Sequence, residues 1–293
     1  MVDAMLLVGD VAPARVAALL ANEVDLAKDL PVSAIPDVEQ NAKLTLMTAP
    51  SYRIFQIVLS SLEEHKSPLH DKRVRQAVNY AIDKQAIIDS LFFKKATALN
   101  GQLLRAPQLG YNPDLKDYPY DPAKAKQLLA EAGYPNGFEI IFKTPAGRYV
   151  QDREVSEAVA GMLAKVGIKT KMVTLEPGEF LRQLRARELA PMAFLGLAPD
   201  DDPDFQMAQY HSSWRYSYVK NPALDKLIDA GKQEMDVEKR GAIYREMMTL
   251  VRDEAPVVFL YGGVEIFGAS KKLKDFTPRG DGRIFLYGSS LAN

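Results

Sequence analysis

The sequence predicts an α/β fold built around a mostly parallel sheet, and three observations support this. Between residues 137 and 197, stretches typical of strands and of helices alternate, in the order strand, helix, strand, helix, strand. This is the pattern of parallel strands joined by right-handed helical crossovers. The chain has 293 residues, enough for one large or two ordinary domains. Its composition, 47% hydrophobic and 26% charged, is that of a globular protein.

The first part of the chain predicts a shorter set of elements. Residues 3–9 favour a strand, residues 12–23 a helix and residues 51–59 a second strand. From Asp71 to Phe92, apolar residues recur at helical spacing, which indicates a helix over this whole stretch.

The next helix carries clear start and stop signals. In "YDPAKAKQLLAEAGYP", Asp121 is the expected N-cap, Pro122 the first helical residue and Gly133 the stop. Further on, the predicted strands are 137–144, 168–175 and 192–197, with helices at 150–167 and 177–189 between them. Two more helices, 221–233 and 236–256, and a strand at 256–268 complete the chain.

Composition excludes several classes of protein. Thirty-seven basic and thirty-eight acidic side chains nearly cancel, so we expect no nucleic-acid partner. The longest apolar runs are far shorter than the roughly 20 residues that a membrane span needs. Without cysteine the chain has no disulfide and no thiolate chemistry. The start "MVDAMLLVGD" carries no recognisable export signal, as in a cytoplasmic, mature or truncated chain.

Three loops follow the predicted central strands, at the carboxyl ends where open α/β sheets gather ligands. The first offers Arg148 and Tyr149, the second Glu176 and Glu179, and the third an acidic cluster in "GLAPDDDPDF". A guanidinium binds a carboxylate through two parallel hydrogen bonds, and an aspartate accepts hydrogen bonds from an ammonium group. The topology therefore predicts a site for a zwitterion, such as an amino acid or a peptide.

Each of these candidates has an alternative explanation. The acidic cluster comprises Asp200, Asp201, Asp202 and Asp204, and it could be a solvated turn or the cap of the next helix. A calcium loop is disfavoured, because Phe205 and His211 stand where that loop needs a glycine and an acid. Arg148 could equally pair with Asp152 at the surface.

The remaining polar and aromatic residues predict no catalytic centre. Trp214 and Tyr216 could form a stacking wall for a ligand or could be ordinary packing. The carboxylates of the Glu176 and Glu179 pair could serve acid–base chemistry, but exposed helices often carry such pairs. The histidines, His65, His70 and His211, lack the spacing of metal ligands. We expect no cofactor, no metal and no enzyme activity.

Several long stretches together resemble the family 5 extracellular solute-binding proteins, the peptide- and nickel-type receptors of bacterial ABC importers. These stretches are 13–31, 70–88, 118–140, 163–185 and 221–261. The resemblance implies a periplasmic-binding-protein type II-like α/β fold, with one intact lobe around a parallel or mixed sheet and a remnant of the other lobe. It places the remnant of lobe one at 1–57, the ligand-gripping second lobe at 58–261, and a return to lobe one at 262–293.

The resemblance also implies a function. Such proteins are not enzymes; they close around a peptide or a similar small solute, outside the cytoplasm, and deliver it to a membrane permease. In dipeptide-binding members an aspartate of a GWxxD stretch holds the ligand's amino group. The matching "GLAPD" assigns this role to Asp200, although Leu197 replaces the tryptophan. Arg148 matches the carboxylate-binding arginine, and Tyr149, Asp202, Trp214 and Tyr216 complete the expected ligand-binding set.

Family members carry further residues before the point where this chain begins, so we expect a C-terminal fragment. Such a fragment would bind ligand weakly by itself, and it would self-associate or need the missing N-terminal portion as a partner. The alternatives are a stand-alone interaction or chaperone-like role and, less favoured, a carboxylate-dependent hydrolase.

Overall fold

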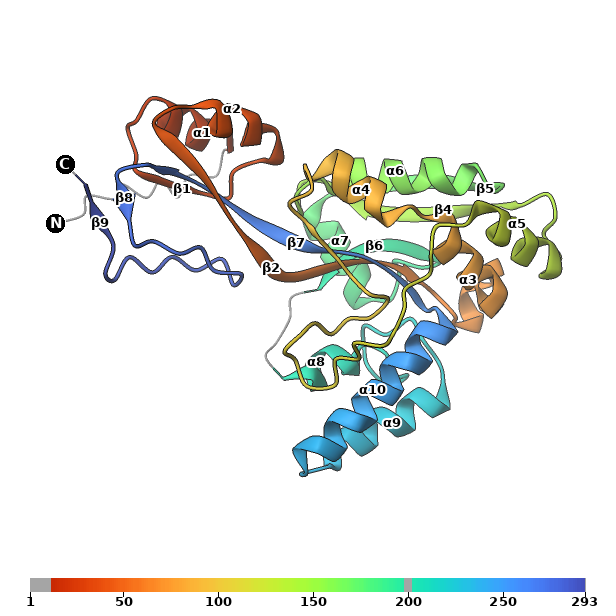
Figure 1. Ribbon diagram of the computed structural model, residues 1–293. Helices are drawn as coiled ribbons and strands as arrows, with labels where there is room; N and C mark the ends of the chain where they lie inside the picture. The colour runs from red at the N-terminus through yellow and green to blue at the C-terminus, as the bar shows by residue number, and fades with distance from the viewer. Residues whose placement is uncertain (1–11, 198–201, 293) are drawn as a thin grey trace. The chain divides into compact units, whose positions relative to one another are not determined.

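The structure, a computed structural model, describes residues 12–197 and 202–292 (Figure 1). The predicted strand at 3–9 therefore lies outside the described residues. The chain forms two compact units. Their ranges are Met1–Tyr52, Ile88–Thr97 and Gly262–Asn293 for the first unit, and Arg53–Ile87 and Ala98–Tyr261 for the second.

A mixed sheet runs through the second unit, with the strand order β7-β2-β6-β4-β5. Its strands are β2 (Leu44–Leu59), β4 (Phe138–Pro145), β5 (Ile168–Leu175), β6 (Met192–Leu197) and β7 (Val257–Ser270). β4 pairs in parallel with β5 and β6, as the alternating sequence pattern predicts, whereas β2 pairs antiparallel with β6. The long strands β2 and β7 each contribute residues to both units.

Strands β4 and β5 begin opposite each other and end opposite each other. Phe138 lies opposite Ile168, and the register continues unbroken to the pair of Pro145 and Leu175. Gly137 precedes β4 with a φ of 72°, and a Cβ there would lie 1.9 Å from the carbonyl oxygen of Gly167. Only a glycine fits this close approach, so the starts of the two strands are fixed against each other.

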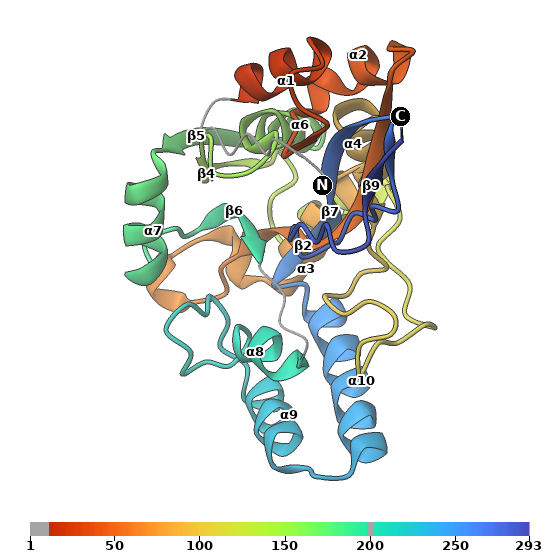
Figure 2. The ribbon, with the colours of Figure 1, turned by 90° about the vertical axis from the view of Figure 1, so that its left-hand side faces the viewer.

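Helices α6 (Asp152–Ala164) and α7 (Pro177–Arg185) are the crossovers between these strands (Figure 2). α6 packs against β4 and β5, and Ser156 of α6 donates a hydrogen bond of 2.7 Å to Thr144 of β4. Phe180 of α7 is fully buried in a cluster with residues of β5 and β6.

The helix predicted from Asp71 to Phe92 is in fact two helices, α3 (Lys72–Ala81) and α4 (Lys84–Leu91). Between them Ile82 is extended, with φ −105° and ψ 116°. Asp83 then accepts a hydrogen bond of 2.9 Å from the backbone N–H of Ala86. A capping carboxylate satisfies the unpaired amides of a new helix start, so the helix breaks although the apolar spacing continues. The expected N-cap at Asp121 is confirmed at α5 (Pro122–Glu131), which packs against α3.

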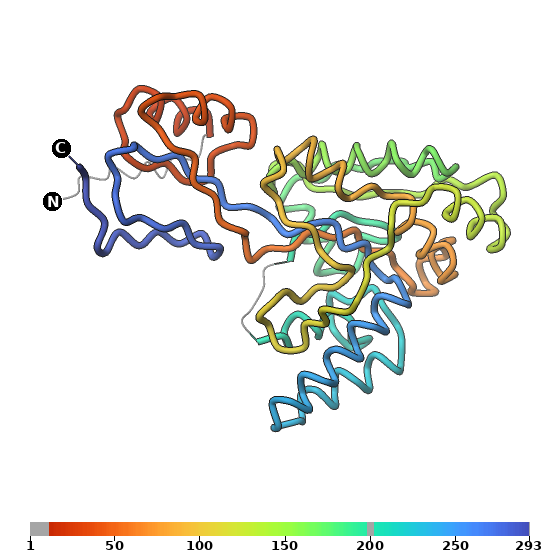
Figure 3. Tube along the Cα trace, viewed as in Figure 1, coloured from red at the N-terminus to blue at the C-terminus, as the bar shows by residue number. Residues whose placement is uncertain are grey.

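Helices α8 (Pro203–Ala208), α9 (Pro222–Gln233) and α10 (Val237–Glu254) pack together in the second unit (Figures 1 and 2). Their core is apolar and includes Met207, Tyr210, Leu224, Ile228, Tyr244, Met247 and Val251. Before α5, residues 99–121 form an irregular segment, which the Cα trace in Figure 3 shows.

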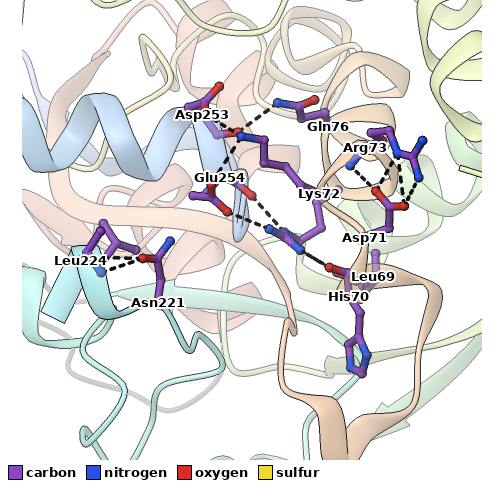
Figure 4. A network of polar contacts seen from close by, with 12 residues as sticks. Leu69, His70, Asp71, Lys72, Arg73, Gln76, Asn221, Leu224, Asp253 and Glu254 are labelled. Atoms are coloured by element: carbon purple, nitrogen blue, oxygen red, sulfur yellow. Dashed lines mark hydrogen bonds and ion pairs between the residues drawn. The ribbon is translucent and has the colours of Figure 1, made fainter. Parts of the chain in front are cut away.

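Polar contacts attach the end of α10 to the start of α3 (Figure 4). The guanidinium of Arg75, whose side chain is only 5% exposed, donates to the carbonyl oxygens of Leu69, His70 and Glu254, each at 2.9 Å. Lys72 donates to the carboxylate of Asp253 at 2.7 Å. Because a buried cation is costly unless its donors are satisfied, these carbonyl contacts make Arg75 a fixed link between the two helices.

The first unit carries α1 (Ala12–Leu20), β1 (Leu26–Lys28), α2 (Ile35–Gln40), β8 (Leu273–Lys274) and β9 (Ser290–Leu291). β1 pairs antiparallel with the second half of β7, and β8 pairs with β9. Leu26, Phe267, Ala269 and Phe276 form a small buried cluster. Among the described helices, none combines the length and the apolar run needed to cross a bilayer.

Candidate functional site

The three loops singled out in the sequence follow strands that lie side by side. β6, β4 and β5 are parallel neighbours, so their carboxyl ends lie at the same edge of the sheet. This arrangement confirms the parallel strand pattern on which the choice of loops rests. Such an edge is where α/β sheets bind ligands.

The first of these loops, residues 146–151, is held in place by Asp152, the first residue of α6. Its carboxylate is buried and accepts hydrogen bonds from four backbone N–H groups. The donors are Gly147, Arg148, Tyr149 and Arg153, at 3.2, 2.9, 3.0 and 2.9 Å. Asp152 therefore contacts Arg148 through its backbone and shapes the loop.

The side chain of Arg148 turns to Tyr149 instead. Its Nε donates to the Tyr149 hydroxyl at 3.1 Å, and its Cζ lies 5.2 Å from the centre of the tyrosine ring. The hydroxyl in turn donates to the carbonyl oxygen of Gly196 at 3.2 Å. Within the described part of the chain, no carboxylate lies within ion-pair distance of Arg148, and the side chain is half-buried. The arginine therefore keeps donors for a ligand carboxylate.

A second arginine, Arg53 of β2, lies against the same ring, with its Cζ 5.7 Å from the Tyr149 centroid. The loop pattern of the sequence does not indicate Arg53, because this residue lies inside a strand and not in a loop. Alternation along "SYRIFQIVL" places Arg53 on the same face of β2 as Phe55. Phe55 also contacts Tyr149, edge to face, at 5.4 Å. That alternation was the signal that could have found it.

A cluster of aromatic rings packs against Tyr149. Phe55 stacks on Phe194 at 5.6 Å and on Tyr261 at 4.9 Å, and Tyr149 meets Phe194 edge to face at 5.9 Å. A Cβ on Gly196 would lie 2.8 Å from Phe55 and 2.9 Å from Tyr149, so a glycine is required at this position of β6. The rings and Asp152 together fix the position of Tyr149.

The acidic segment is only partly described. Asp200 and Asp201 lie outside the described residues. Asp202 caps α8, and its carboxylate accepts a hydrogen bond of 2.9 Å from the backbone N–H of Asp204. The same carboxylate pairs with both terminal nitrogens of Arg240 on α10, at 2.8 and 3.0 Å. These hydrogen bonds from Arg240 lower the pKa of Asp202 below its ordinary value.

Arg240 also neutralises the next acid of the segment. It forms an ion pair of 2.9 Å with Asp204, and its Nε donates to the hydroxyl of Tyr244 at 3.1 Å. Tyr244 in turn donates to Asp204, and burial, followed by this contact, raises the pKa of the tyrosine. Two of the four aspartates thus form ion pairs within the chain, and Asp202 has the helix-cap role that the sequence offered as an alternative.

Trp214 and Tyr216 form a separate aromatic group. The indole meets Phe205 edge to face at 6.0 Å and Tyr216 at 6.2 Å. Phe205 is 56% exposed, and both Trp214 and Tyr216 are half-buried. A hydrogen bond from Arg215 lowers the pKa of Tyr216. None of the described ring contacts joins this group to Tyr149, so the structure has two distinct aromatic surfaces.

The carboxylate of Glu179, considered for acid–base chemistry, is paired with a cation. Arg182 holds it with hydrogen bonds of 2.7 and 2.8 Å and lowers its pKa to about 2. A carboxylate this acidic is a poor proton donor or acceptor near neutral pH. Within the described residues, no group of three or more histidines and carboxylates could hold a metal ion.

The comparison with known protein families is decisive. The family model of the bacterial extracellular solute-binding proteins, family 5 Middle, matches residues 7–218. The chain belongs to this family. The resemblance seen in the sequence is confirmed. Because the members of this family are solute-binding proteins and not enzymes, the match also confirms the expectation of a non-enzyme.

Individual family members agree with this result. Heme-binding protein A of Haemophilus influenzae is 29% identical over 289 residues, which cover 96% of this chain and 52% of that protein. The dipeptide-binding protein of Escherichia coli is 30% identical over 275 residues, covering 90% of this chain and 50% of that protein. The chain thus spans about half the length of the curated relatives it matches.

The solved structures place the fold in the same family. HbpA2 from Haemophilus parasuis matches with a TM-score of 0.82 at 28% identity, over 97% of this chain and 57% of that one. The predicted α/β fold of the periplasmic-binding-protein type II class is confirmed by this match.

Proposed function

We propose that the chain is the ligand-gripping part of a solute-binding protein that delivers peptides or similar small solutes to a membrane ABC permease. The site of action is periplasmic or extracellular. In this proposal residues 58–261 are the lobe that grips the ligand, and residues 1–57 and 262–293 belong to the other lobe. The names of the family members, which include a dipeptide-binding protein, support this class of ligand.

The observation that carries the proposal is the fixed presentation of Arg148 and Tyr149. Asp152 locks the loop backbone with four hydrogen bonds, and the aromatic rings support the tyrosine. A binding group that is held before the ligand arrives loses little conformational entropy on binding. The guanidinium of Arg148 can therefore bind a carboxylate at little entropic cost.

The other ligand contacts are assigned from the sequence. Asp200 accepts hydrogen bonds from the ligand's ammonium group, while Asp202, paired with Arg240, sets where the acidic segment enters α8. Tyr149 takes part by holding the guanidinium of Arg148 beside the ligand, through its hydroxyl and its ring. Trp214 and Tyr216 flank side chains of the ligand.

A dipeptide and two blocked analogues test this proposal. NMR titrations of the labelled chain with Ala-Phe, N-acetyl-Ala-Phe and Ala-Phe-amide report on the amides of residues 147–149. We expect Ala-Phe to bind in the millimolar range, since the chain spans half the length of its relatives, and both blocked peptides to bind at least about tenfold more weakly.

Two variants assign the contacts. Asp200→Asn should bind Ala-Phe and its N-acetyl analogue equally, and Arg148→Gln should bind Ala-Phe and its amide equally. Asp201→Asn, a neighbouring change of the same charge, is the control and should keep the preference for free termini. Ala-Phe binding that ignores both blocking groups, or that perturbs no amide of this loop, would sink the proposal.

Partners of this chain follow from the same proposal. We expect the part of its relatives that this chain does not span, supplied as a separate chain, to bind it and to raise its affinity for Ala-Phe. In the absence of that portion, self-association would cover apolar surface. Light scattering of the chain with and without the supplied portion measures both.

A further inference from the structure

A pocket of about 590 Å³ lies in the second unit, among β4, the end of α7 and the segment that leads into β6. Its lining includes Glu64, His65, Lys143, Gln183, Arg187 and Glu188. None of these residues belongs to the candidate ligand set, so the pocket is a separate feature of the molecule.

Lys143 reaches the pocket from the sheet. Its neighbour Thr144 faces α6, where it bonds to Ser156, so alternation places Lys143 on the opposite face, toward α7. The ammonium donates to Gln183 Oε1 at 2.9 Å and to the carbonyl oxygen of Glu188. Both acceptors are neutral. Burial lowers the pKa of Lys143, as expected for a cation without a direct ion pair.

Arg187 supplies the second positive charge. Its Nε donates to the carbonyl oxygen of Arg215 at 3.2 Å, and Nη2 donates to those of Ser212, at 3.3 Å, and Trp214. Among the described residues, no acceptor binds Nη1, so its two protons are left for another acceptor. Arg187 has a φ of 58°, just after the end of α7, where glycine is the usual residue.

The acids around the pocket do not pair directly with these two cations. Glu188 lines the pocket, but Arg182 holds its carboxylate at 2.8 Å. Glu64 is exposed at the rim. No ion pair among the described residues involves Lys143 or Arg187, so two positive charges face the pocket with only neutral oxygens as direct partners. Fixed charges arranged in this way attract an anion.

His65 is a further polar residue that lines the pocket. Its Nδ1 lies 2.6 Å from the hydroxyl of Ser60. Burial, the largest effect, lowers its pKa; the charges of His70, Arg187 and Lys143 lower it further, and Glu64 opposes them. The ring is therefore neutral at physiological pH and can hydrogen-bond a ligand without adding charge.

We propose that this pocket binds a small polyanion that carries carboxylate or phosphate groups, with Lys143 and the free edge of Arg187 as its charged contacts. The volume suits a compact organic anion, since small-molecule sites commonly measure about 300–1,000 Å³. None of the lining residues named above is a contact of the peptide site proposed above, although Arg187 donates to the backbone of Trp214, which that proposal places beside the peptide.

The single tryptophan reports on this pocket, because the carbonyl oxygen of Trp214 accepts a hydrogen bond from Arg187. Citrate and pyrophosphate are titrated separately at constant ionic strength while the tryptophan emission is followed. We expect a saturable change with at least one of them. Saturation by citrate alone identifies a carboxylate ligand, and saturation by pyrophosphate alone identifies a phosphate ligand.

Variants link the response to the two cations. Lys143→Met should weaken binding about tenfold, as should Arg187→Lys, which keeps the charge but loses the planar fork. The control is Lys171→Met, an exposed lysine of β5 in the same sheet, and it should leave the affinity unchanged. Asp200→Asn and Arg148→Gln should also leave it unchanged, which separates this site from the peptide site.

Thermal unfolding first establishes that each variant is folded, and Arg187→Lys carries the test if Lys143→Met is not. The proposal is overturned if neither anion gives a saturable response. It is equally overturned if the response survives in both pocket variants or is lost in Lys171→Met.

Discussion

The guanidinium of Arg240 meets the carboxylate of Asp202 through two parallel hydrogen bonds, from Nη1 at 3.0 Å and from Nη2 at 2.8 Å. The same guanidinium pairs with Asp204 at 2.9 Å. Four aspartates within five positions would repel one another, and Arg240 relieves that repulsion for two of them. The acidic segment thus enters α8 with part of its charge already neutralised by α10.

Replacing Arg240 with methionine should lower the free energy of unfolding by about 1–2 kcal/mol, because it removes a two-pronged ion pair and leaves two acids side by side. Urea unfolding measures the change. Lys239→Met is the matched control, because this exposed neighbour makes no described side-chain contact, and its effect should be close to zero. Equal losses in the two variants would contradict the structural role of Arg240.

The same pair predicts a dependence on acid. The hydrogen bonds from Arg240 hold the pKa of Asp202 below its ordinary 3.8, so in acid the folded protein binds fewer protons at this site than the unfolded chain. The contribution is therefore present above about pH 3.8 and is lost as pH falls through the folded-state pKa. The stability difference between the parent and Arg240→Met, measured by urea unfolding from pH 6 to pH 2, should shrink over that window. A difference that grows in acid would show the opposite sign.

Asp152→Asn should lower the free energy of unfolding by about 2–3 kcal/mol, because an amide nitrogen then faces backbone N–H groups that lose their acceptor. Hydrogen exchange should show faster exchange at the amides of residues 147–149, the loop that carries Arg148 and Tyr149. Glu154→Gln, an exposed acid of the same helix turn, serves as the control. Unchanged protection of the loop amides in Asp152→Asn would refute this assignment.

Gly196→Ala should destabilise the protein by about 1–3 kcal/mol, since the new methyl group would overlap Phe55 and Tyr149. Thermal unfolding measures the loss. Gly161→Ala in the exposed part of α6 is the control: its Cβ meets nothing within 4 Å, so helix propensity should raise stability by about 0.5–1 kcal/mol. The prediction fails if both changes act in the same direction.

His65→Gln should flatten the pH dependence of stability in mild acid. Burial lowers the pKa of His65 from its ordinary 6.5, so below about pH 6.5 the unfolded chain takes up a proton that the folded protein resists. Stability due to the neutral ring is complete above that pH and is lost as pH falls through the lower, folded-state pKa. Chemical unfolding at pH 5 and pH 7 should show a smaller difference in the variant than in the parent. A larger change in stability between pH 5 and pH 7 in the variant than in the parent would contradict a lowered pKa of His65.

Local signals were enough to predict the alternating core of the second unit. Strands β4, β5 and β6 were predicted within a residue or two, because their apolar runs end at turn residues and Gly167 stops the intervening helix. The same signals identified the loop of Arg148 and Tyr149. Each of these features depends on residues close together in the sequence.

The features that the sequence did not reveal depend on contacts between distant residues. Asp152 reads as a surface partner for Arg148, yet it is buried and binds backbone amides. Nothing near Asp202 indicates that Arg240, 38 positions away, would neutralise it. The break at Asp83 was missed for a different reason: apolar spacing continues through it, and only the cap marks the new helix.

The matched ends of β4 and β5 have a consequence for how this molecule can change. A strand advances about 3.3 Å per residue, so inserting or deleting one residue in either strand would raise one rim loop relative to its neighbour. The same slip would also exchange the inward-facing and outward-facing side chains of that strand. The paired strands therefore fix the positions of the two loops relative to each other. New ligand preferences can arise by exchanging loop residues while the length of both strands stays the same.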